Sequence, residues 1–191
     1  HNLHESGFLL FQDLYFVPIE ILLVTFLLEK VISDREKKAR LEHQNIVISA
    51  FFSEVGNNAI RRLNCFIDNI DEISSHLNMN QKWESSDFSA AEKALKHIDY
   101  EIKTSKDLLI TLKEILPRKK EYILSLFSNP NLLEIDEFTD MLWALYHLID
   151  EIEHRDDIAA LPASDIEHLS GDIARIYKML VLSWIVYMKH L

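Results

Sequence analysis

The chain has 191 residues, enough for one domain with or without an anchor, and its three glycines and four prolines are too few for the turns of a sheet protein. Its formal net charge is −11 at pH 7, and twelve acids lie between Glu134 and Asp172 against one base, Arg155. Such a field repels phosphate, which argues against a nucleic-acid-binding role, and attracts cations or a basic partner. The single cysteine, Cys65, excludes an internal disulfide and fits a reducing compartment.

The first feature along the chain is an apolar run, Leu14–Leu28, whose one charged residue is Glu20. A bilayer core requires about 20 apolar residues, and the run reaches that length only with its polar flanks included. A buried helix of a soluble cytoplasmic bundle is therefore an alternative interpretation. The run is nevertheless apolar on every side of a helix, and it is followed by a basic cluster of Arg35, Lys37, Lys38 and Arg40. We predict a membrane anchor in contact with lipid, with the rest of the chain in the cytoplasm.

Glu20 constrains that interpretation, because a carboxylate inside a membrane costs about 2.5–3.5 kcal/mol unless it faces water or a partner. The simplest partner is the same helix of a second copy, so we expect the anchor to self-associate with Glu20 at the contact. The alternative is that Glu20 lies near the membrane surface and reaches water. Both interpretations divide the chain into an N-terminal apolar segment, residues 1–33, and a cytoplasmic helical domain, residues 34–191.

Apolar residues recur at helical spacing along the rest of the chain, which predicts an all-α bundle of five or six helices. The first is a long helix, 34–77, that continues from the apolar segment and bends at Gly56. A polar loop, 78–86, follows, and Asp87 is a candidate N-cap for the next helix. The remaining predictions are a helix capped by Ser105, a kink or restart at Pro117, a helix over 132–153, and a last helix capped by Ser164 or Asp165. The helix over 132–153 carries the apolar stripe Phe138, Met141, Leu142, Leu145, Leu148, Ile149 and Ile152. The last helix carries the stripe Ile166, Leu169, Ile173, Ile176, Leu180, Trp184, Tyr187 and Leu191.

The most specific chemical pattern lies at the turn between the last two predicted helices. Glu151 and His154 are three residues apart, and Asp165 and His168 repeat this spacing across a short connection. Carboxylate and imidazole groups from facing helices hold iron or manganese in helical bundles, and four such groups also suit zinc. We therefore consider a metal site, although Glu151 and His154 lie opposite the apolar stripe of their helix. A solvated acidic rim with no cofactor is the alternative, and it is the one that the outward orientation favours.

Trp143, His147 and Asp150 share the outward face of the helix over 132–153. A large aromatic side chain on such a face is typical of a contact surface, either for another helix of the bundle or for a partner. No pair of a nucleophile and a base can be identified in the sequence, and no phosphate-binding loop is present. The sequence therefore leaves enzymatic activity uncertain, and we lean towards a protein without catalysis of its own.

Four segments resemble a group of uncharacterised prokaryotic proteins: Val17–Thr25, Arg35–Lys37, Phe51–Gly56 and Leu142–Leu148. The resemblance implies N-terminal membrane helices followed by a cytosolic helical domain, and it assigns no activity to any residue. The sequence analysis thus predicts a membrane-anchored interaction or regulatory module that binds a protein partner or forms a homo-oligomer. The rival prediction is a metal-binding helical protein or enzyme that uses Glu151, His154, Asp165 and His168.

Overall fold

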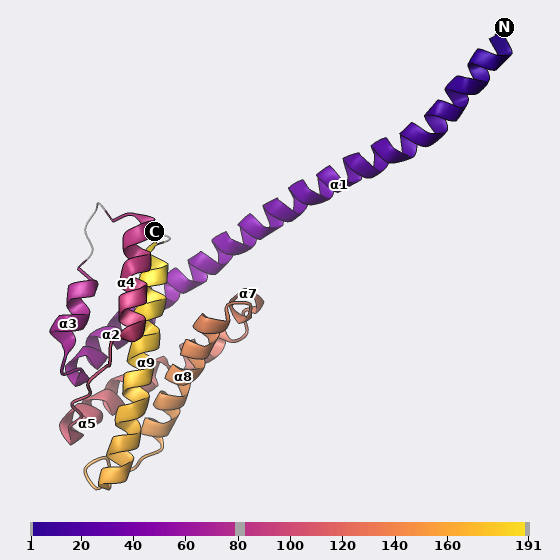
Figure 1. Ribbon diagram of the computed structural model, residues 1–191. Helices are drawn as coiled ribbons and strands as arrows, with labels where there is room; N and C mark the ends of the chain where they lie inside the picture. The colour runs from indigo at the N-terminus through magenta and orange to yellow at the C-terminus, as the bar shows by residue number, and fades with distance from the viewer. Residues whose placement is uncertain (1, 79–82, 190–191) are drawn as a thin grey trace. The chain divides into compact units, whose positions relative to one another are not determined.

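The computed structural model describes the backbone of residues 2–78 and 83–189, and the side chains of residues 16–78, 83–132 and 134–189. Within these ranges the chain forms nine α-helices, two short 3₁₀ segments and one π-helical turn (Figure 1). The only pairing of extended backbone among them is an isolated antiparallel bridge between Ile67 and Ile102. The all-α fold class is confirmed for the described residues. The predicted number of five or six helices is too low for them, because π and 3₁₀ turns and short loops divide the long predicted helices. The structure divides into two compact units, His1–His43 and Gln44–Leu191.

The first unit is a single helix, the N-terminal part of α1 (Asn2–Phe51), which continues through Pro18. Every side chain described in this unit, from Phe16 to His43, is exposed. Leu14 and Tyr15, the first residues of the predicted anchor, lie outside the described side chains. No helix in the part of the chain that the structure describes is long and apolar enough to cross a bilayer. The boundary predicted between residues 33 and 34 stays a prediction.

The second unit begins with the last turns of α1, which are attached to the bundle through Gln44. This side chain is buried, and its Nε2 donates a hydrogen bond of 2.9 Å to the backbone oxygen of Asn131. The long helix predicted over 34–77 is interrupted at the buried pair Phe51 and Phe52, where a π turn inserts an extra residue. The elements that follow α1 are η1 (Phe52–Gly56), α2 (Asn57–Leu63), η2 (Asn64–Phe66) and α3 (Ile70–His76).

The middle of the bundle is made of short helices with identifiable caps. The helix predicted to start at Asp87 starts earlier, because Asp87 accepts a hydrogen bond of 2.8 Å from the backbone N–H of Glu84 as the third residue of a capping box. Ser105 is the predicted N-cap, and its hydroxyl accepts from the N–H of Leu108. Pro117 restarts the chain as a 3₁₀ segment, as expected. These elements are α4 (Ser85–His97), α5 (Lys106–Ile115), η3 (Leu116–Lys119), α6 (Lys120–Leu126) and α7 (Pro130–Leu133).

The two longest helices of the second unit are α8 (Asp136–Glu153) and α9 (Ala163–Lys189). Figure 1 shows α9, in yellow, running alongside α4 and α8, and the helices pack against each other in those pairs. The stripe predicted for α8 is confirmed, because all of its members are buried in one continuous core. They are Phe138, Met141, Leu142, Leu145, Leu148, Ile149 and Ile152.

The stripe predicted for α9 is only half right. Leu169, Ile173, Ile176 and Leu180 are buried, but Trp184 and Tyr187 are half-exposed. Their places in the core are taken by Tyr177, Val181 and Ile185. The C-terminal half of this helix is apolar nearly all round, so the neighbouring helices, and not the periodicity, decide which side is covered. Leu191 lies outside the described residues.

Candidate functional site

The turn from α8 to α9 is organised around the guanidinium of Arg155. Its Nη2 donates to Oε1 of Glu151 at 2.5 Å, and its Nη1 donates to Oδ2 of Asp165 at 2.6 Å. These hydrogen bonds, first of all the one to Glu151, raise the pKa of Arg155 above its ordinary value. Two of the four predicted metal ligands are therefore held together by a cation of the protein itself.

His168 lies on the next turn of α9 and faces the same carboxylate of Glu151. Its Nε2 is 3.4 Å from Oε1 of Glu151 and 3.5 Å from Oδ2 of Asp172. Arg175 in turn donates to Oδ1 of Asp172 at 2.8 Å. Glu151, His168 and Asp172 each offer one ligand atom, and these atoms lie within 4.8 Å of one another. This trio resembles the predicted metal site but includes Asp172, one turn further along α9, in place of Asp165.

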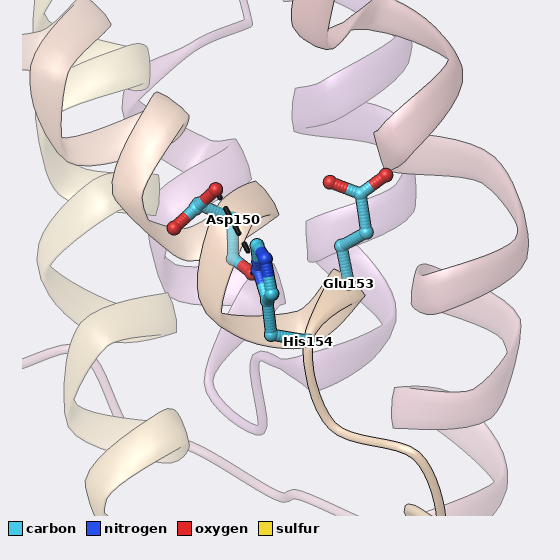
Figure 2. Close-up of side chains that lie close together, drawn as sticks. All are labelled: Asp150, Glu153 and His154. Carbon is cyan, nitrogen blue, oxygen red and sulfur yellow. Dashed lines mark hydrogen bonds and ion pairs between the residues drawn. The ribbon is translucent and has the colours of Figure 1, made fainter.

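His154, the fourth predicted ligand, belongs to a different group. Its Nδ1 lies 2.7 Å from the backbone oxygen of Asp150 and 3.6 Å from the carboxylate of that residue. Figure 2 shows Asp150, Glu153 and His154 together at the C-terminal end of α8. Ligand atoms of these three residues also lie within 4.8 Å of one another. Of the four residues of the predicted site, His154 belongs to the trio around Asp150, Glu151 and His168 belong to the trio around Glu151, and Asp165 belongs to neither.

The trio of Asp150, Glu153 and His154 also has a cation of the protein beside it. Nζ of Lys120, the first residue of α6, is 2.7 Å from Oδ1 of Asp150 and 2.5 Å from Oε2 of Glu153. The hydrogen bond from Lys120 holds the pKa of Asp150 below its ordinary value, and the hydrogen bonds to the two carboxylates raise the pKa of Lys120. The ammonium group bridges the two carboxylates and takes the place that an ion shared between them would need.

Two further lysines bind the backbone of the same turn. Lys113 of α5 donates to the backbone oxygens of Arg155 and Asp156, and Lys106 donates to that of Ala159. The backbone oxygens of a turn have no partners in a helix, so a lysine is a favourable donor to them. The acidic segment between residues 134 and 172 is therefore compensated by cations from α5 and α6, which are distant in the sequence.

Trp143 and His147, two residues of the predicted contact surface, lie in an aromatic face that also contains Phe127 and Tyr146. The ring of Trp143 stacks on Phe127, with centroids 4.1 Å apart and an interplanar angle of 26°, and His147 stacks beside Trp143 at 5.7 Å. Tyr146 meets Trp143 edge to face, and Nζ of Lys120 lies 5.8 Å from the centroid of Tyr146. Trp143 keeps 42% of its surface exposed. Contact with a partner through Trp143, His147 and Asp150 stays a prediction, as does the contact through Glu20 in the first unit.

These features define an all-helical protein with an acidic, cation-braced turn and an exposed aromatic face. The comparisons with known proteins identify its family. Residues 40–191 match the family described as "Uncharacterized protein MJ1433, C-terminal helical domain", and residues 1–32 match "MJ1433, N-terminal helical domain". The chain is 40% identical over 186 residues to Uncharacterized protein MJ1433 of Methanocaldococcus jannaschii, covering 97% of this chain and 74% of that protein. The chain belongs to the MJ1433 family.

The family assignment confirms the resemblance to uncharacterised helical proteins. It brings no activity, substrate or ligand to any residue of this chain. No solved structure matches the chain. The functional argument therefore rests on the geometry described above.

Proposed function

We propose that this protein is a helical interaction module without catalysis of its own, held at a membrane by the apolar run Leu14–Leu28. The observation that carries the proposal is the exposure of α1 in the first unit. Ten large apolar side chains between Phe16 and Leu28 each leave 48% or more of their surface in water. They surround the helix instead of forming one stripe, so a single neighbouring helix covers only part of them. A lipid environment covers all sides at once.

The magnitudes favour insertion despite the carboxylate of Glu20. Full burial of one large apolar side chain is worth about 1.5–3 kcal/mol. Ten half-exposed side chains therefore outweigh the cost of about 2.5–3.5 kcal/mol for one carboxylate at the centre of a membrane. The cations Arg35, Lys37, Lys38 and Arg40 add about 1 kcal/mol each where they face an anionic leaflet. Their position after the run supports a cytoplasmic bundle.

Fractionation of cells that express the full chain tests the anchor. We expect the protein in the membrane fraction and its retention there after a carbonate wash. Leu22→Lys with Leu23→Lys should release it, because two ammonium groups near the centre of the run cost about 5 kcal/mol or more. The matched control is Ile46→Lys, which changes an apolar residue with 64% exposure outside the run. Complete recovery of the wild-type protein in the soluble fraction would refute the proposal.

The interaction role is supported by the aromatic face. Aromatic side chains that remain exposed next to charged groups are enriched in protein contact surfaces. Phe127 and His147 both stack with Trp143, so this side chain loses little conformational entropy when a partner covers it. The partner expected for this face is a protein, either a second copy of the chain or another polypeptide.

Metal binding at Glu151, His168 and Asp172 is a second candidate function. The observation in its favour is the convergence of one imidazole and two carboxylates from α8 and α9. Such a set suits iron, manganese or zinc, and acid should weaken binding because protons compete with the metal for its ligands. Elemental analysis of protein purified without chelator tests it. Less than about a tenth of an equivalent of these metals would exclude a resident ion at the affinity of about 10–16 kcal/mol typical of structural zinc.

A further inference from the structure

A groove on the second unit, distant from both trios, contains features that the functions above do not use. It lies between α4 and α8 and over the C-terminal half of α9, and it encloses about 200 Å³. Its apolar floor is the α9 strip formed by Met179, Leu182 and Val186. Its walls carry Glu92 and Lys96 from α4, and Glu137 and Asp140 from α8. We call it the α4–α8 groove.

The floor has the geometry of a helix-binding surface. Met179, Leu182 and Val186 follow the spacing i, i+3, i+7, so the exposed apolar strip runs along α9 for about 10 Å. Val186 leaves 38% of its surface in water although its inner neighbour Ile185 is buried. The volume is below the range of about 300–1,000 Å³ that is usual for sites of small molecules and cofactors. A strip of this length and depth fits one or two large side chains from the face of a partner helix.

The charged residues on the walls of the groove indicate that the partner is basic. Three carboxylates face one amine, and Nζ of Lys96 is already bound to Oε1 of Glu92 at 2.7 Å. The hydrogen bond to Glu92, together with the charge of Glu137, raises the pKa of Lys96, so the amine stays protonated and occupied. Asp140 makes no ion pair among the residues that the structure describes. An occupant without positive charge would remove water from the two carboxylates of α8 without replacing it.

We propose that the α4–α8 groove binds a basic amphipathic helix of another polypeptide, which inserts large apolar side chains onto Met179, Leu182 and Val186 and places Lys or Arg against Glu137 and Asp140. The charge complementarity between the carboxylate walls and such a helix carries the choice of occupant. The inference rests on the interaction role proposed above and is independent of the membrane anchor. It specifies the chemistry of one partner and adds a second contact surface to the aromatic face.

Methyl NMR of the full chain tests the proposal. The protein is labelled with ¹³C at its methionine methyl groups and purified in a buffer or detergent in which it does not aggregate. The probe is a synthetic helical peptide of about 15 residues with leucine at i, i+3 and i+7 and lysine on both flanks. We expect the Met179 methyl signal to move saturably with added peptide, and the signal of the fully buried Met141 to stay in place. Met179→Leu assigns the signal. A peptide with glutamate in place of every lysine is the control.

The variant Glu137→Gln with Asp140→Asn should weaken binding by about threefold to tenfold and reduce its salt dependence. The matched control, Asp156→Asn with Glu167→Gln, removes two exposed carboxylates outside the groove and should leave the affinity unchanged. The proposal would be overturned if the Met179 signal did not move at about 1 mM peptide, or if the acidic peptide bound equally well. It would also be overturned if the Met179 signal shifted on dilution of the protein alone, because the occupant would then be a second copy of the chain. Membrane fractionation is unaffected by any of them, so failure here leaves the anchor intact.

Discussion

The two glycines described inside helices of the second unit should respond in opposite directions to the same substitution, Gly→Ala. A methyl group at Gly56 would lie 2.5 Å from Cδ1 of Phe52 and 2.9 Å from Cε1 of Phe51, whereas a methyl group at Gly171 meets nothing within 4 Å. Both glycines have negative φ, so alanine adopts either backbone conformation without strain. Only the packing differs between the two positions.

The rings beside Gly56 have no room to move. Phe51 and Phe52 are fully buried, Phe51 meets Phe138 edge to face, and Phe52 stacks on Tyr187 with centroids 5.0 Å apart. Overpacking of a core costs about 1–3 kcal/mol, and alanine recovers about 0.5–1 kcal/mol of helix propensity. Gly56→Ala should therefore lower the free energy of unfolding by about 0.5–2 kcal/mol, and Gly171→Ala should raise it by about 0.5–1 kcal/mol.

Tryptophan fluorescence during thermal unfolding measures both effects, since the three tryptophans of the chain, Trp83, Trp143 and Trp184, all lie in the second unit. We expect Tm to fall by about 2–6 °C for Gly56→Ala and to rise by about 1–4 °C for Gly171→Ala. In a double-mutant cycle with Phe52→Leu, the Gly56→Ala penalty should shrink, because the ring that it meets has been removed. An equal rise in Tm for both alanine variants would refute the packing argument.

Two further predictions concern charged residues. Lys120→Met should lower the stability of the second unit near neutral pH and leave it unchanged near pH 2. The hydrogen bond from Lys120 lowers the pKa of Asp150. The stability that this ion pair contributes is therefore fully present above the ordinary pKa of 3.8 and is lost as the pH falls through the lowered pKa. Urea unfolding at both pH values measures this, and an equal loss at pH 2 would contradict it. In membranes, Glu20→Leu should strengthen insertion and abolish crosslinked dimers, whereas a Glu20→Ala protein that crosslinks like wild type would assign Glu20 to the interface with water.

The sequence predicted best those features that depend on one helix alone. The stripe of α8 follows a period of 3.6 residues, and every one of its predicted members is buried. Ser105 caps α5 through a local hydrogen bond to Leu108, which a capping residue makes whatever its distant neighbours are. The acidic face of α8 was likewise predicted to point outward, and His147 and His154 are exposed.

Features decided by neighbouring helices could not be predicted in this way. A bend at Gly56 was predicted, and the structure has a π turn over Phe52–Gly56. This turn, and the ring of Phe52 that excludes a side chain at Gly56, come from tertiary packing. In α9, Tyr177 and Val181 are buried in place of Trp184. The C-terminal half of this helix is apolar nearly all round, so the positions of α4 and α8 determine which side is buried. The amphipathic pattern contains no information on that choice where no polar face exists.

The cations beside the candidate metal site could not be predicted from the sequence either. They also decide which of the two functional proposals comes first. The acidic segment contains one base and twelve acids in the sequence. In the structure, Arg155 pairs with Glu151 of one trio, and Lys120, which comes from another helix, pairs with Asp150 of the other. A divalent ion between Asp150 and Glu153 would have to displace the ammonium of Lys120, and an ion on Glu151 would compete with the guanidinium of Arg155. Metal binding at either trio therefore opposes contacts that brace the turn, whereas insertion of the exposed α1 run opposes none of its described contacts. These contacts oppose the metal proposal but do not bear on the interaction module, so the module stays our first proposal and its membrane anchor is decided by fractionation.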